Sequence, residues 1–408
     1  MTPLPRPTRF DQTRSFVRDP YTFITATCER LGSDFFESRL FLKRTICLRG
    51  EDFAALFYDN DLFERRGVAP GWLLGCPFGR GRVPELDDLA QRQRRALWLS
   101  VRSPGSVLRA RRLFREEWGW GALRWEDQGP VVLYEELHPL LTRVACAWAG
   151  IPLPEVDVAT RAKDFVALFD APGALGWRHL EARLARRRID AWLGRLVRDV
   201  RGGAAVEPSS VLERLAHARL GDAAAAAELR NLIRSTVALS AYIVCLALAL
   251  HHHPEAAPKT ANQRTPFIQE VRRYYPFFPV VVGRVRRTFE WRGTRFPAGR
   301  RAFLDFHGTN RDARTWTLPD EFLPGRFANS PPRAGEELSL AILDEALLQL
   351  TGCMTYSVPP QDLLLDMKRL PALPRSGLVL DQVRLSEMDE SSARRFSGAT
   401  ETMSRKLA

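Results

Sequence analysis

The chain has 408 residues, of which 45% are hydrophobic, so it is long enough to bury one large core or two ordinary ones. Its 60 lysines and arginines exceed its 48 aspartates and glutamates, which gives a net charge of +12. This is the composition of a globular protein. Basic runs such as residues 183–188 alternate with leucine and alanine at helical spacing, so we interpret them as solvated helix faces and expect no nucleic-acid partner.

The six cysteines are scattered, and no two of them form a C-x-x-C pair. Most of them lie in apolar runs, where a free thiol behaves as a small core residue, so we expect a reducing, cytoplasmic location. The first ten residues contain prolines and arginines and do not read as a secretory signal. The longest apolar segment, residues 236–250, is shorter than the roughly 18 residues of a membrane span, so we expect a buried helix and no membrane span.

In chain order, the patterns predict short strands and helices first, then a long helical region, then a region of alternating polarity. A glycine-centred turn in the sequence Trp-Arg-Gly-Thr-Arg-Phe predicts a hairpin at residues 291–296. The predicted strands and helices are a strand at 44–48, a helix at 51–58, helical spacing from 86 to 250 that is clearest at 133–148 and 162–169, and alternation at 278–304.

A last helix is predicted near residues 336–350, and prolines punctuate the segment that follows it. Residues 386–408 are rich in serine, glutamate and arginine, so we expect a disordered tail. The predicted fold is therefore mainly α with a minor β part, in a single large domain over residues 1–385.

Two separated segments carry a recognisable pattern. Glu270 and Arg273 stand three residues apart on a predicted helix, which puts them on one face where a bidentate ion pair can form. Further on, Trp316, Pro319, Phe322 and Pro324 lead to Arg326 in a loop rich in proline and aromatic residues. Together the two segments resemble the Glu-x-x-Arg helix and the meander arginine of the cytochrome P-450 superfamily.

The resemblance becomes more specific in the sequence QEVRRYYPFFPVVVGRVRRTFEWRGTRFPAGRRAFLDFHGTNRD, which is similar to the bacterial fatty-acid peroxygenases, the hydrogen-peroxide-dependent fatty-acid hydroxylases of that superfamily. The stretches FYDNDLFERR, TRVACAWAGIPL and VPPQDLLLDMKRLPALPRSGLVL look like the same branch. Because the match runs collinearly over nearly the whole chain, it implies a cytochrome P-450 fold. It also implies that Glu270, Arg273 and Arg326 form a structural network.

In that family, an arginine and a proline on the long central helix hold the fatty-acid carboxylate. The resemblance places Arg234 at the arginine and Ser235 at the proline. A cation on an otherwise apolar helix is costly to bury unless it is paired, so a carboxylate ligand is a sensible partner. A protein acid or a helix carbonyl is the alternative partner for Arg234.

A second group of candidates precedes the long helical region. Arg94, and Arg65 with it, look like the basic residues that pair with haem propionates in the family. Glu85, Asp87 and Asp88 add acids beside the expected cavity, where they are candidates for acid–base catalysis. The alternative is a solvated helix start, because acids are favoured there by the helix dipole.

The stretch after Phe327 holds only Ala-Asn-Ser-Pro-Pro-Arg-Ala before Gly335. In the family, a glycine-rich loop at this place ends in the cysteine whose thiolate is the fifth ligand of the haem iron. The resemblance places Arg333 where that cysteine stands, and most of the loop has no counterpart. Cys353 lies some five helical turns beyond this place, and Cys245 lies on the central helix and is expected to face the wrong side of any haem, so we expect neither to replace it. We therefore expect no metal site and no cofactor, with haem only if it is held in a non-standard way.

Three functions are consistent with this pattern. The first is a haem-independent, non-redox enzyme that acts on a carboxylate-bearing apolar substrate, fatty-acyl or natural-product, held by Arg234. In that case Arg65 and Arg94 would be free to bind a second anionic group. The second is a peroxide-dependent fatty-acid hydroxylase with non-standard haem binding, and the third is a non-catalytic ligand-binding or partner protein. A small apolar carboxylate is the expected ligand, and a protein partner or a homo-oligomer stays open.

Overall fold

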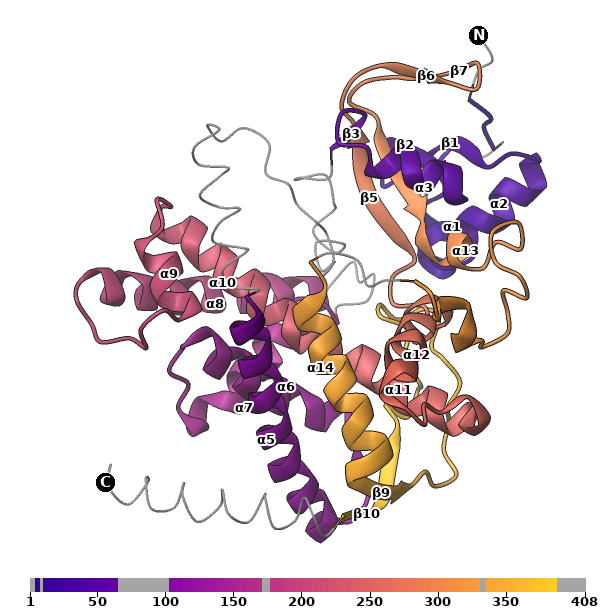
Figure 1. The fold of residues 1–408 in the computed structure, drawn as a ribbon. Helices are drawn as coiled ribbons and strands as arrows, with labels where there is room; N and C mark the ends of the chain where they lie inside the picture. The colour runs from indigo at the N-terminus through magenta and orange to yellow at the C-terminus, as the bar shows by residue number, and fades with distance from the viewer. Residues whose placement is uncertain (1–3, 8–9, 65–102, 171–176, 331–334, 387–408) are drawn as a thin grey trace, which may run out of the picture.

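The computed structural model describes residues 4–7, 10–64, 103–170, 177–330 and 335–386. These residues form a large helical lobe and a smaller lobe built around a β-sheet (Figure 1). The sheet lobe combines the N-terminal segment with residues 280–305, which lie far away in sequence. The prediction of a mainly α fold with a minor β part is confirmed. The tail predicted from residue 386 lies, apart from Ser386 itself, outside the described residues.

The described helices are α1 Thr13–Arg18, α2 Phe23–Leu31, α3 Glu51–Tyr58, α5 Pro104–Gln128, α6 Leu133–Ala149, α7 Glu155–Ala167, α8 Trp177–Arg201, α9 Val211–His217, α10 Asp222–Val237, α11 Leu239–His252, α12 Ala261–Tyr274, α13 Phe306–Asn310 and α14 Glu337–Leu348, with short turns at Pro254–Ala256, Pro324–Phe327 (η2) and Gln349–Cys353 (η3, a π-helix). The strands are β1 Phe35–Leu40, β2 Lys43–Leu48, β3 Phe63–Glu64, β4 Val131–Val132, β5 Val280–Val285, β6 Phe289–Trp291, β7 Thr294–Phe296, β8 Arg301–Asp305, β9 Met354–Ser357 and β10 Val379–Leu385.

The main sheet has the strand order β1-β2-β8-β5-β3, in which β2 and β8 are parallel and the other neighbours are antiparallel. The strand predicted at 44–48 lies in β2, and the helix predicted at 51–58 is α3. The predicted hairpin at 291–296 is formed by β6 and β7. Its turn residues, Arg292 and Gly293, both have positive φ, as a tight two-residue hairpin turn requires.

Helices α10 and α11 run through the helical lobe, and nearly all of α11 is buried. A single residue, Ala238, separates the two helices and has a right-handed helical backbone conformation. Its N–H donates to the Arg234 carbonyl at 3.0 Å. Residues 222–252 are together long and apolar enough to cross a membrane, but 94% of their most apolar window is buried inside the protein. The predicted reading of 236–250 as a buried helix is therefore confirmed.

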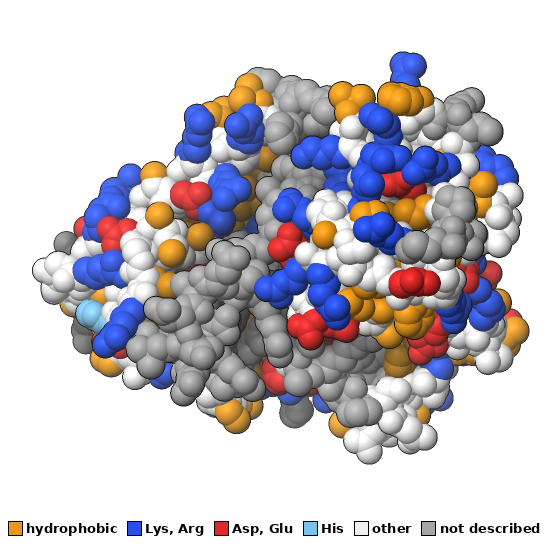
Figure 2. Space-filling model, turned by 90° about the horizontal axis from the view of Figure 1, so that it is seen from above, with side chains coloured by type: hydrophobic (Ala, Val, Ile, Leu, Met, Phe, Trp, Pro, Cys, Tyr) orange, Lys and Arg blue, Asp and Glu red, His pale blue; other side chains and the backbone are white. Residues whose placement is uncertain are grey.

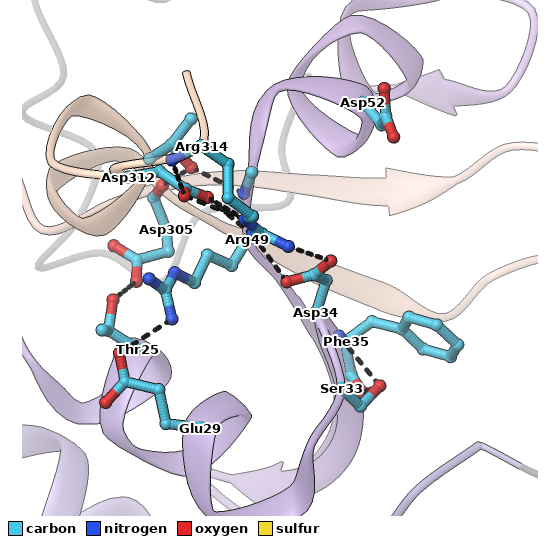
Figure 3. A network of polar contacts seen from close by, with 12 residues as sticks. Thr25, Glu29, Ser33, Asp34, Phe35, Arg49, Asp52, Asp305, Asp312 and Arg314 are labelled. Atoms are coloured by element: carbon cyan, nitrogen blue, oxygen red, sulfur yellow. Dashed lines mark hydrogen bonds and ion pairs between the residues drawn. The ribbon is translucent and has the colours of Figure 1, made fainter. Parts of the chain in front are cut away.

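The loop after β8 is fastened to the N-terminal segment by charged contacts (Figure 3). Arg314 lies between two carboxylates, with hydrogen bonds of 2.8 Å to Asp34 and 2.6 Å to Asp312. Next to them, the Thr25 hydroxyl donates to the Asp305 carboxyl at 2.6 Å. Asp305 is only 1% exposed, and burial raises its pKa to about 6.

The surface reflects the basic composition. On the face seen in Figure 2, lysine and arginine predominate over acidic side chains, and hydrophobic side chains lie among them.

Five cysteines of the described residues are free thiols, namely Cys28, Cys47, Cys146, Cys245 and Cys353.

Candidate functional site

The structure brings Glu270, Arg273 and Arg326 into one buried network. Arg273 donates to the two carboxylate oxygens of Glu270 at 2.8 and 2.7 Å, and Arg326 donates to one of them at 3.3 Å. The backbone N–H of Leu323 adds a further bond at 2.8 Å. Glu270 is 0% exposed, so its charge is stabilised entirely by protein donors.

The network also holds the loop between α13 and η2. The remaining N–H groups of Arg273 donate to the carbonyls of Asn310, Pro319 and Glu321 at 2.8 to 3.0 Å. The Trp316 ring lies 5.4 Å from the Arg273 guanidinium and 5.9 Å from that of Arg326. Arg273 therefore gives a donor to loop carbonyls that would otherwise lack one, and these bonds fix the loop on α12.

A second set of contacts, which sequence reasoning missed, holds the start of α14. Arg272 of α12 makes a bidentate pair with Glu336, at 2.9 and 3.0 Å, and also hydrogen-bonds Tyr242 of α11. Arg264 of the same helix donates to Asp344 at 2.6 Å. Glu336, the residue before α14, is therefore tied to α12 by Arg272, and Arg272 is in turn bonded to α11.

Glu345 on α14 is a further buried carboxylate that the sequence analysis did not single out. Arg111 and Arg115 of α5 donate to it at 2.6 and 2.7 Å, and Gln349 does so at 3.1 Å. Burial opposes its ionisation, but these donors outweigh burial and hold its pKa below the ordinary value. The sequence signal that could have identified it is an acid among the apolar residues Ile342, Leu343 and Ala346, which predicts a buried carboxylate.

Arg234 and Ser235 lie in the last turn of α10. Arg234 is 8% exposed, so its cation is held inside the helical lobe. The Ser235 hydroxyl donates to the carbonyl of Leu232 at 2.9 Å, and the Thr236 hydroxyl does so at 3.1 Å. Both hydroxyls therefore satisfy a carbonyl of their own helix, at the place where the helix is interrupted.

The other predicted site residues fall outside the described residues. These are Arg65 and Arg94, the acids Glu85, Asp87 and Asp88, and Arg333.

The potential iron ligands can be compared with what a thiolate-ligated haem needs. Residues 328–336 contain no cysteine, histidine or tyrosine, and the chain has no cysteine between Cys245 and Cys353. Cys245 lies inside α11, where burial raises the pKa of its thiol well above the ordinary value and disfavours a thiolate. The segment before α14 therefore does not fit a haem held by a thiolate from that segment.

Comparison with curated proteins gives only short matches. No family model matches the chain. Cytochrome P450 71B37 of Arabidopsis thaliana is 44% identical over 64 residues, and Cytochrome P450 84A4 of the same plant is 27% identical over 111 residues. The chain covers 13% and 22% of those two proteins.

Comparison with solved structures covers nearly the whole chain. Cytochrome P450SP alpha (CYP152B1) in complex with (R)-ibuprophen is 41% identical, with a TM-score of 0.83 over 92% of this chain and 99% of that one. Cytochrome P450EX alpha (CYP152N1) with myristic acid is 33% identical, with a TM-score of 0.86 over 94% and 99%. A variant of cytochrome P450 OleT in complex with arachidonic acid is 28% identical, with a TM-score of 0.85 over 94% and 99%.

These neighbours correct one prediction. The CYP152 enzymes are haem-dependent, so the expectation that no cofactor is needed is wrong. The expectation rested on the missing cysteine and on the loop residues that have no counterpart in this chain, and the loss of one segment does not remove the rest of a haem fold.

Proposed function

Because this chain belongs to the CYP152 branch of fatty-acid peroxygenases in the cytochrome P450 superfamily, we propose that it is a haem-dependent fatty-acid hydroxylase. Its substrate would be a long-chain carboxylic acid, with hydrogen peroxide as the oxidant. The observation that carries the proposal is the match of 40 to 41% identity over 99% of the P450SP alpha chain. Neighbours in complex with myristic and arachidonic acids support the substrate class.

We propose Arg234 as the residue that holds the substrate carboxylate. Arg234 follows the apolar residues Leu232 and Ile233 of α10 and is 8% exposed, so an anion is a fitting partner for its buried cation. Ser235 would lie beside that carboxylate, but its hydroxyl already serves the Leu232 carbonyl. Ser235 therefore adds little to the binding energy that Arg234 supplies.

Arg65 and Arg94 remain proposed partners for anionic groups, and Glu85, Asp87 and Asp88 remain proposed acid–base groups. In a haem-binding protein, arginines at 65 and 94 would meet propionates, as the family resemblance implies. Whatever ligates the iron, residues 328–336 do not offer a thiolate. That segment therefore supplies no thiolate for the oxidation.

The same lack of a thiolate favours a second function, binding of fatty acid without turnover. A haem thiolate pushes electron density towards the O–O bond, and a protein without it loses that assistance. The ligand site on α10 does not depend on residues 328–336. A protein that binds myristic acid tightly but does not hydroxylate it would be of this kind.

We also propose that residues 1–385 form one P450 unit and that the protein is cytoplasmic. The free thiols of the described residues support a reducing compartment. A small apolar carboxylate is the proposed ligand.

The test has two parts. The absorption spectrum of the full chain after haem-supplemented expression reports whether haem is bound, and the spectrum after reduction, with and without carbon monoxide, reports whether a thiolate holds it. Myristic acid binding, measured by calorimetry, reports on the carboxylate site. Arg234→Ala is expected to weaken binding by at least about ten-fold, since a charge-assisted hydrogen bond contributes about 1.5–3 kcal/mol.

The matched control is Arg195→Ala on the exposed side of α8, which should leave myristic acid binding unchanged. Equal affinities of the Arg234 and Arg195 variants would remove Arg234 from the site. A colourless protein that fails to take up haem would refute the hydroxylase, and normal myristic acid binding by that protein would then support the second function.

A further inference from the structure

The hairpin between β1 and β2 ends in an unusual turn. Its two residues, Phe41 and Leu42, have φ of 53° and 60°, a conformation that normally selects asparagine or glycine. The turn is braced from α1, because the Phe41 N–H donates to the Thr13 hydroxyl and the Leu42 N–H donates to the Asp11 carboxylate at 3.1 Å. Large side chains are thus held in a strained backbone by neighbours, which is a feature of functional positions.

The turn presents apolar surface to water. Leu42 is 76% exposed, and Phe10, which adjoins the Asp11 brace, is 72% exposed. The Arg39 guanidinium lies 4.3 Å from the centre of the Phe10 ring. Two large apolar side chains therefore lie on one corner of the sheet lobe next to a cation, and none of the residues that the structure describes covers them.

The charge around this corner is basic. Lys43 and Arg44 follow the turn directly and are exposed, and Arg14 is exposed on α1. The acid in β1, Glu37, is 3% exposed and pairs with Arg6, Arg44 and Arg300.

A polar groove continues from the same corner. It lies between α1 and α2, has a volume of about 500 Å³, and begins at Gln12, next to the Asp11 brace. Two arginines, Arg18 and Arg30, line it, and its other polar lining residues are Ser15, Asp19, Thr22 and Thr27. The two guanidinium groups suit the phosphate of a lipid headgroup, while the Thr22 hydroxyl donates to the Asp19 carboxylate in the same lining.

We propose that this corner, the hairpin tip formed by Phe10, Phe41 and Leu42 with Arg39, Lys43 and Arg44, docks on the surface of an anionic lipid bilayer. Phe10 and Leu42 enter the boundary of the acyl chains, and the basic side chains meet the anionic headgroups. A protein partner fits less well, because a stable protein interface buries about 800 Å² on each side around an apolar centre. The tip is instead a convex corner with two apolar anchors.

This inference is independent of the proposed function, because it uses no residue of the α10 site. The full chain is sedimented with vesicles of phosphatidylcholine, with and without phosphatidylglycerol. We expect binding only to the anionic vesicles, and weaker binding at higher salt. Leu42→Asp and Lys43→Glu should each weaken binding several-fold, and together by more than about ten-fold.

Matched controls change an exposed valine and an exposed lysine far from the tip. Val156→Asp and Lys259→Glu make the same changes of polarity and charge at other exposed positions, 85% exposed in the case of Val156, and should bind like the unchanged protein. The unchanged protein, the two single tip variants, the double tip variant and the two controls should all melt at the same temperature, since Leu42 and Lys43 are exposed.

The depth of docking is tested with Phe10→Trp. In anionic vesicles with brominated acyl chains, the added tryptophan emission should be quenched, because the side chain reaches the acyl region. Three results overturn the proposal: no binding of the unchanged protein to anionic vesicles, whatever soluble acidic protein it captures; equal losses in the tip and control variants; or binding without quenching.

Discussion

The network around Glu270 on α12 and the segment of residues 328–336 differ in which features of a P450 they retain. On the α12 side, the Glu270 carboxylate receives bonds from Arg273, Arg326 and a backbone N–H. In 328–336, by contrast, no side chain can serve as a strong iron ligand of the thiolate, imidazole or phenolate type. The contacts that fold a P450 scaffold and the residue that ligates its iron are therefore separable, and keeping the first does not imply the second.

The largest loss of stability is expected when Glu270 is removed from the network that it forms with Arg273 and Arg326. Glu270→Ala leaves the Arg273 guanidinium buried, at 2% side-chain exposure, without its counter-ion. Removing one member of a buried pair costs about 3–5 kcal/mol, so we expect a large loss of stability or of soluble protein. Urea unfolding followed by circular dichroism measures the change.

Glu290→Ala on the exposed surface of β6 is the control and should change stability by less than about 0.5 kcal/mol. Similar unfolding midpoints for the two variants would mean that the network does not support the fold, and the contrast between the two regions would disappear.

The network of Glu270, Arg273 and Arg326 was also the part of the site that could be predicted from the sequence. Glu270 and Arg273 are three residues apart, so helix geometry alone puts them on one face. Arg326 could be connected to them only through the family resemblance, because the contact spans 56 residues. The Arg272–Glu336 pair was not predicted, since nothing local tells which of two adjacent arginines turns to the buried acid and which to the next helix.

The fold was predictable where periodicity is strong and local. Helix α3 and the hairpin of β6 and β7 follow from spacing and a turn glycine. The pairing of β2 with β8 joins residues more than 250 positions apart, and no local pattern specifies such a contact. The cofactor prediction failed for a different reason, because it weighed one absent loop and its cysteine above a match along the whole chain.

A pH-dependent loss is expected at Asp305, in the sheet lobe. Its pKa is about 6 in the folded protein because of burial, against 3.8 ordinarily. Between pH 4 and 6 the folded state keeps a proton that the unfolded state has released, so stability falls as pH rises through this window. The fall is about 3 kcal/mol, is complete above pH 6, and should vanish in Asp305→Asn, which mimics the protonated acid.

Urea unfolding at several pH values checks this, with Asp127→Asn on the exposed side of α5 as the control. A pH profile of Asp305→Asn that parallels the unchanged protein would mean that Thr25 and Gly308 satisfy the ionised carboxylate fully. Asp305 would then belong with Glu270 among the acids whose charge the protein stabilises.

An intermediate effect is expected at Glu345. Glu345→Ala removes a buried acceptor from Arg111 and Arg115, but these side chains are 29% and 51% exposed and can be solvated. We therefore expect a loss of about 1–3 kcal/mol, smaller than at Glu270. Glu116→Ala, which breaks the surface pair with Arg112, should cost about 0.5 kcal/mol or less.

Equal unfolding midpoints for Glu345→Ala and Glu116→Ala would show that burial of the carboxylate does not matter there. A loss as large as that of Glu270→Ala would show instead that partial exposure of the two arginines gives no relief. Either result would change which contacts are held responsible for fixing α14.

The smallest effect is expected at Ser235, beside the proposed ligand site. Its hydroxyl donates to the Leu232 carbonyl, which also accepts from Thr236, so Ser235→Ala leaves that carbonyl with a donor. We expect a change in stability within about 0.5 kcal/mol and unchanged myristic acid affinity. If affinity falls as much as in Arg234→Ala, the hydroxyl must leave its helix to meet the carboxylate, and the end of α10 would be a site that the ligand completes.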